Sequence, residues 1–122
     1  MTVRPPQMYS RKEREGALGY EIAQEQAAAL GRLGRALEAA LAALTEHDGL
    51  QGLRQDRLEQ TAAGAVRAHL LREATNALWC FVVQREACGL RDQRAIMRDY
   101  RVPADVQNRM GVFGAATRLP TG

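Results

Sequence analysis

A run of seven consecutive apolar residues, Ala77 to Val83, is the feature that most constrains the fold of this chain. The run lies inside a segment that otherwise has the 3.6-residue periodicity of an amphipathic helix, so its middle two turns are apolar on every side. A helix that is apolar all round has to be buried all round. Because 122 residues form only a thin helical bundle, we predict that a second copy of the chain covers part of this run.

The predicted contact between the two copies is centred on the same run. One face of this helix packs against the preceding helix, which leaves Trp79 and Val83 in need of cover on the opposite face, with Cys80 and Phe81 beside them. Twofold symmetry would bring the same patch of each chain together. We therefore predict a homodimer interface at Trp79, Val83, Cys80 and Phe81.

Two long helices joined by a single turn are predicted. Between residues 16 and 46, apolar side chains recur on one face of a helix, with charged residues opposite: Ile22, Leu30, Leu33, Leu37, Leu41 and Leu44. The segment 47–52 is the only internal cluster of turn residues, and it should reverse the chain into a helical hairpin. The second helix begins between residues 53 and 58 and runs to Cys88, where Gly89 followed by Leu90 is typical of a helix stop.

Two short helices are predicted after Gly89. Asp92 can cap the first, which runs to Tyr100 and ends because the residue before Pro103 avoids the helical region. The second follows Pro103 and stops at Gly111. The predicted organisation is a flexible N-terminal arm (1–15), a single helical domain (16–111) and a flexible C-terminal tail (112–122). The predicted fold is all-α: a long antiparallel helical hairpin with two short C-terminal helices, assembled into a dimeric helical bundle.

Composition excludes several classes of protein. The 17 basic and 14 acidic residues give a net charge of only +3, spread along the chain, whereas a nucleic-acid footprint is denser. No apolar run approaches the roughly 18 residues of a membrane span, and the N-terminus lacks the apolar region of a signal peptide. Cys80 and Cys88 are about 12 Å apart along one helix and cannot bridge within the chain. We therefore expect a protein of the reducing cytoplasm without a membrane partner.

No catalytic or metal centre is predicted. Catalysis by Cys80 or Cys88 would need a positioned base such as His69, but no motif surrounds either group, and buried structural thiols explain them better. His69 and Glu73 are one turn apart and could supply two metal ligands, yet such pairs are common on helix surfaces. We expect no cofactor and no enzymatic activity.

The segment 93–110 offers an alternative function, because two short helices about a tight turn resemble a helix-turn-helix. Arg94, Arg98, Arg101 and Arg109 would be its nucleic-acid contacts. Against this, the turn lacks the usual glycine and the second helix is short for entering a major groove. DNA binding is therefore the second hypothesis, and packing of the pair against the hairpin is the first.

Three segments carry a resemblance to a known family: 79–92 (WCFVVQREACGLRD), 100–103 (YRVP) and 109–111 (RMG), with weaker similarity over 20–44. They resemble a family of short all-helical bacterial proteins of unknown function. The resemblance implies a helical fold and no particular activity. We predict a non-enzymatic interaction or scaffold protein that forms a homodimer. A second, different protein partner is compatible with this role. A DNA-binding regulator is the alternative, and small-ligand binding or catalysis at a dimer pocket is the third hypothesis.

Overall fold

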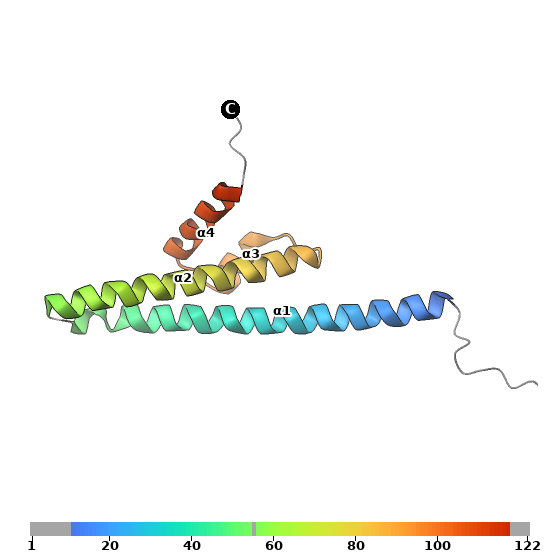
Figure 1. Ribbon diagram of the computed structural model, residues 1–122, viewed down its shortest axis with the longest axis horizontal. Helices are drawn as coiled ribbons and strands as arrows, with labels where there is room; N and C mark the ends of the chain where they lie inside the picture. Colours follow the sequence, from blue (N-terminus) through green and yellow to red (C-terminus); the bar gives the residue numbers. More distant parts are fainter. Residues whose placement is uncertain (1–10, 55, 118–122) are drawn as a thin grey trace, which may run out of the picture.

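The computed structural model describes residues 11–54 and 56–117. Within them the chain forms four α-helices and one short 3-10 helix: α1 (Arg11–Gly49), η1 (Gln51–Leu53), α2 (Arg57–Ala87), α3 (Gln93–Asp99) and α4 (Ala104–Thr117). Figure 1 shows α1 and α2 as an antiparallel hairpin, with α3 and α4 lying beside α2. The predicted helical hairpin with two shorter C-terminal helices is confirmed for these residues, and its assembly into a dimer remains a prediction.

The core lies where the two long helices cross the C-terminal pair. Leu37, Leu41 and Leu44 are buried on one face of α1, at the spacing that places side chains above one another on a helix. They pack in one cluster with Leu78 of α2, and burying each leucine fully contributes about 2 kcal/mol. The C-terminal part of the chain adds further buried side chains to this cluster: Ile96, Val102, Val106 and Met110.

The C-terminal end of α2 has the predicted stop. Gly89 has a φ of +84°, its N–H donates to the Glu86 carbonyl at 2.9 Å, and the N–H of Leu90 donates to the Arg85 carbonyl at 2.8 Å. These two bonds form a Schellman motif, in which glycine adopts the left-handed conformation without a Cβ clash. Asp92 then caps α3 by accepting from the Ala95 N–H at 3.2 Å, as predicted.

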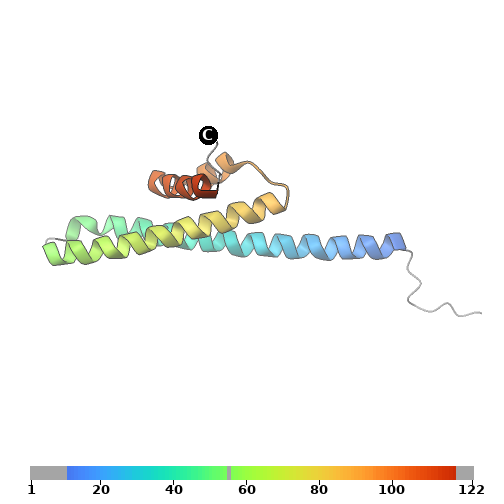
Figure 2. The ribbon, with the colours of Figure 1, turned by 45° about the horizontal axis from the view of Figure 1, so that its top comes forward.

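One arginine ties α4 to the hairpin turn. Arg67 of α2 donates to both carboxylate oxygens of Asp48, at 2.8 and 3.1 Å, and to Asp105 of α4 at 2.7 Å. The hydrogen bonds from Arg67 hold the pKa of each aspartate below its usual value, and the two carboxylates raise the pKa of Arg67. Figure 2 shows α4 lying beside the middle of α2. Arg67 thereby links the hairpin turn at Asp48 to the start of α4 at Asp105.

The helix ends differ from the predicted boundaries. α1 begins at Arg11 and not at Gly16, and it continues to Gly49. α4 continues through Gly111 to Thr117, since a glycine lowers helix propensity by about 1 kcal/mol but does not by itself end a helix. The remaining parts of the predicted arm (1–10) and tail (118–122) lie outside the described residues.

Candidate functional site

The apolar run of α2 is covered mostly by the chain itself. Leu78, Phe81 and Val82 are buried, because α1, α3, α4 and the turn between α3 and α4 supply the apolar side chains that cover them. Phe81 is only 4% exposed, and its ring meets that of Tyr100 edge to face with centroids 5.2 Å apart. Phe81 is therefore a core residue of one chain, and its part in a dimer interface remains a prediction.

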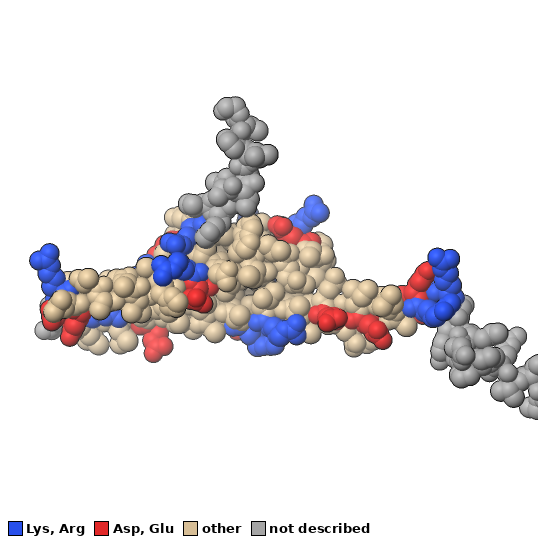
Figure 3. All heavy atoms as spheres, viewed as in Figure 1, with Lys and Arg blue, Asp and Glu red and all other residues tan. Residues whose placement is uncertain are grey.

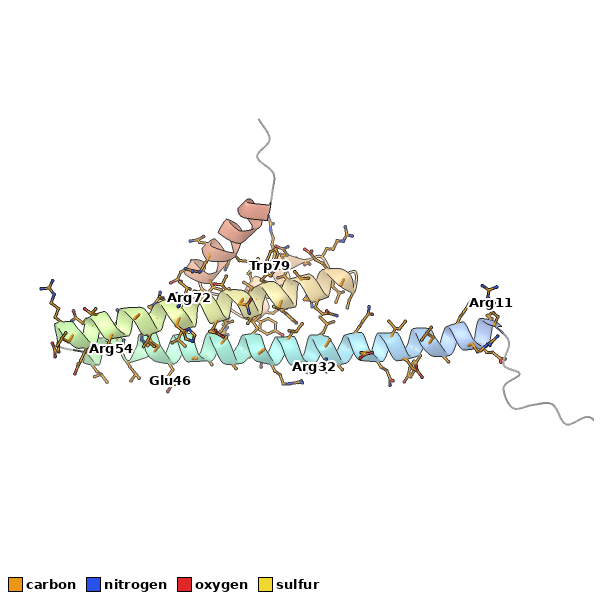
Figure 4. The ribbon with its side chains drawn as sticks, in the orientation of Figure 1. Arg11, Arg32, Glu46, Arg54, Arg72 and Trp79 are labelled. Atoms are coloured by element: carbon orange, nitrogen blue, oxygen red, sulfur yellow. The ribbon has the colours of Figure 1, made fainter. Side chains whose placement is uncertain are left out.

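The other predicted interface residues stay partly accessible. Val83 is 45% exposed, and Trp79 and Cys80 are partly buried. Figure 4 shows Trp79 projecting from α2 toward the side on which α3 and α4 lie. An interface through Trp79, Cys80 and Val83 remains a prediction, although the patch is smaller than the sequence indicated.

The four arginines of the helix-turn-helix hypothesis do not share one surface. Arg94 and Arg98 are exposed one turn apart on α3, and Arg98 donates to Asp99 at 3.2 Å. Arg101 lies on a groove described below, and Arg109 is partly buried. Among residues 104–110, the exposed positions of α4 are Ala104, Gln107 and Asn108, so this part of the helix presents no arginine stripe to DNA. DNA binding remains an untested prediction.

The histidine, glutamate and cysteine side chains considered for catalysis and metal binding do not form a common site among the described residues. His69 and Glu73 are exposed, with Nε2 and Oε1 4.0 Å apart, and Cys80 and Cys88 are free thiols. Within residues 11–54 and 56–117, no group of three or more potential metal ligands comes together. None of the helices described is both long enough and apolar enough to cross a bilayer.

A long overhang of α1 is exposed along its whole length. α1 has 39 residues and α2 has 31, and the N-terminal part of α1 projects past the end of α2 (Figure 1). Each residue from Arg11 to Glu25 is exposed, over about 22 Å of helix. Three large apolar side chains in this overhang are also exposed: Leu18 at 58%, Tyr20 at 66% and Ile22 at 49%. The overhang was not predicted, because the spacing of apolar residues along α1 does not show where α2 stops covering it.

A groove of about 680 Å³ opens between α1, α2 and the end of α3. Its charged and aromatic lining comes from all three elements: Glu38, Phe81, Arg85, Asp99, Tyr100 and Arg101. One wall is tightly fitted, because a Cβ atom at Gly34 of α1 would lie 2.8 Å from the Tyr100 hydroxyl oxygen. Sequence reasoning did not find this groove, since its lining residues are distant in sequence and share no motif.

Residues 6–118 match a family described as a family of unknown function (DUF6665). No curated protein and no solved structure matches the chain. The family match extends over the three segments that carried the resemblance in the sequence, and it brings no assigned activity. The expected bacterial origin stays a prediction. The chain belongs to this family of unknown function.

Proposed function

We propose that the protein is a non-enzymatic, self-associating helical interaction protein of the cytoplasm, and that the α1 overhang joins two copies. The observation that supports the proposal is the exposure of Leu18, Tyr20 and Ile22 on a helix segment with no packing partner in the described chain. Leu18 and Ile22 are one turn apart and lie on one face of α1. Burying both in an interface would contribute about 1 to 3 kcal/mol each.

The overhang has little other support for its helical state. Most helical stability in proteins comes from packing of an apolar face and less from intrinsic propensity. Gly16 and Gly19 lie within the overhang, and each lowers helix stability by about 1 kcal/mol relative to alanine. A packing partner would supply the stability that these glycines remove.

The charges of the overhang favour a second copy in the antiparallel direction. Residues 11–15 carry three basic and two acidic side chains, a net charge of +1, and Arg11 is paired with Glu15 at 3.2 Å. Glu21 and Glu25 follow about two turns later and make that part of the overhang acidic. Figure 3 shows basic side chains with some acidic ones among them at the end of the overhang, and a further acidic group nearer the body of the molecule. In an antiparallel pair, the basic turn of one copy lies beside the acidic turn of the other. A parallel pair would place like charges together.

Size-exclusion chromatography with light scattering tests the proposal. The unmodified chain should elute with the mass of a dimer at micromolar concentration. Leu18→Glu should yield a monomer, because it places a charge in the centre of the proposed interface. Ala17→Glu adds the same charge at an exposed position one residue away, on a different side of the helix, and should leave the dimer intact.

Two results would oppose the proposal. If the unmodified chain is a monomer at about 100 μM, the protein does not self-associate and the proposal is wrong. A dimer that tolerates Leu18→Glu but separates with Val83→Asp would assign the contact to the Trp79 region in place of the overhang.

A further inference from the structure

We propose that the groove between α1, α2 and the end of α3 binds a small organic carboxylate, with Arg101 and Arg85 as its contacts. This inference goes beyond self-association, because the groove residues lie outside the α1 overhang. Arg101 lies in the turn between α3 and α4.

Arg101 occupies a backbone position that favours glycine. Its N–H donates to the Arg98 carbonyl at 3.2 Å, and the N–H of Val102 donates to the Met97 carbonyl at 3.0 Å. This is the same Schellman pattern that ends α2, where the equivalent residue is Gly89. Arg101 has a φ of +50°, in the left-handed region that costs free energy for any residue with a Cβ. Residues held in such conformations concentrate at functional sites, so the Arg101 side chain on the groove is a candidate ligand contact.

Arg85 provides a second guanidinium on the groove. Its Cζ atom lies 5.7 Å from the centre of the Phe81 ring, an arrangement in which the aromatic face holds the cation in place. The Nε atom of Arg85 is buried without a hydrogen-bond partner among the described residues. The Nε atom has almost no accessible surface, so a ligand in the groove would contact the terminal nitrogens of the guanidinium.

The charges around the groove indicate the class of ligand. Asp99 accepts from Arg98 at 3.2 Å, and Glu38 lines the same groove as Arg85 and Arg101. The planar guanidinium fork matches a carboxylate with two parallel hydrogen bonds. Glu38 would accept from a donor at the other end of the ligand, so a carboxylate that also carries an amino group fits better than a simple diacid. The volume of about 680 Å³ is within the range of small-molecule sites, roughly 300 to 1,000 Å³.

Isothermal titration calorimetry with L-glutamate, succinate and inorganic phosphate tests this assignment on the full chain. L-Glutamate should bind, and succinate should bind more weakly. Arg101→Gly, which suits the backbone, and Arg85→Gln should each weaken binding by about tenfold or more, the usual loss for a hydrogen-bonded charged contact. Arg94→Gln removes an exposed guanidinium from the same α3 helix, outside the groove, and should bind as the unmodified chain does.

Glu38→Gln tests the contact with the amino group of the ligand independently of the contacts with its carboxylate. It should reduce binding of L-glutamate to the level of succinate and leave succinate unchanged. Leu18→Glu should bind both compounds normally, which keeps a failure of the groove distinct from a failure of self-association.

Three outcomes would overturn the assignment. The first is the absence of binding by both carboxylates at millimolar concentration. The second is binding that Arg101→Gly and Arg85→Gln leave unchanged. The third is binding of phosphate alone, which would assign the groove to a different class of anion.

Discussion

Replacing Gly34 with alanine tests how closely the end of α3 packs against α1. Gly34 is buried, and an added Cβ atom would lie 2.8 Å from the Tyr100 hydroxyl oxygen and 3.5 Å from Cε1 of Phe81. The first distance is closer than Cβ contacts in proteins, so the Tyr100 ring would have to move. Its movement is opposed by the edge-to-face contact with Phe81, whose own ring is buried.

Two opposing contributions set the magnitude. Alanine favours a helix over glycine by about 1 kcal/mol. Overpacking a fitted site costs about 1 to 3 kcal/mol. We therefore expect Gly34→Ala to lower the free energy of unfolding by about 1 kcal/mol, which corresponds to a fall in Tm of about 4 °C for a domain of this size.

Urea and thermal unfolding followed by circular dichroism measure this change. Gly64→Ala in α2 is the matched control, because a Cβ there meets no atom within 4 Å and should raise stability by about 1 kcal/mol. Tyr100→Phe removes the hydroxyl, so Gly34→Ala should become less destabilising in that background, with a coupling of about 1 kcal/mol. If Gly34→Ala stabilises the protein as much as Gly64→Ala does, the described packing of α3 on α1 is wrong.

Three further predictions concern backbone strain, pH and the apolar run. Arg101→Gly should raise the free energy of unfolding by about 1 kcal/mol in urea titrations, because glycine relieves the left-handed conformation, and an unchanged or lower value would contradict the strain. Asp48 and Asp105 have lowered pKa values in the folded state, so their pairing with Arg67 stabilises the fold above about pH 4 and is lost as pH falls through those values. All three side chains are partly exposed, which limits this effect to about 1 kcal/mol or less, and Arg67→Gln should flatten the acid limb of a Tm against pH profile. Val83→Asp should leave the helical circular dichroism spectrum and the monomer fold unchanged, since the side chain is 45% exposed, and a loss of helix would show that Val83 is a core residue.

Local signals in the sequence predicted the local structure well. The stop at Gly89 and the cap at Asp92 depend on residues within a few positions of each other, and both occur as expected. The hairpin followed from leucine spacing on α1 and from a single cluster of turn residues.

Features that depend on distant contacts were not predictable from the sequence. Phe81 is a core residue because Tyr100, 19 positions later, folds back onto it, and the periodicity of α2 contains no sign of that contact. The overhang arises because α1 extends further from the hairpin turn than α2 does. Leu18 is exposed there, but its position in the helical repeat does not distinguish it from a buried leucine. The conformation of Arg101 was hidden because the usual marker of a left-handed position, glycine, is absent there.

The most direct test of the central claim exchanges the charges of the α1 overhang. One variant carries Arg11→Glu and Arg14→Glu, and a second carries Glu21→Arg and Glu25→Arg. All four positions are exposed, so the fold should tolerate both changes. In an antiparallel pair each variant places like charges together, because its altered turn faces an unaltered turn of the same sign.

Sedimentation equilibrium of each variant and of their equimolar mixture gives the decisive comparison. The account predicts that each variant alone associates more weakly than the unmodified chain and that the mixture regains dimers, with the difference shrinking as salt screens the charges. Undiminished association of either variant alone, or a mixture that remains monomeric, would contradict antiparallel pairing of two α1 overhangs.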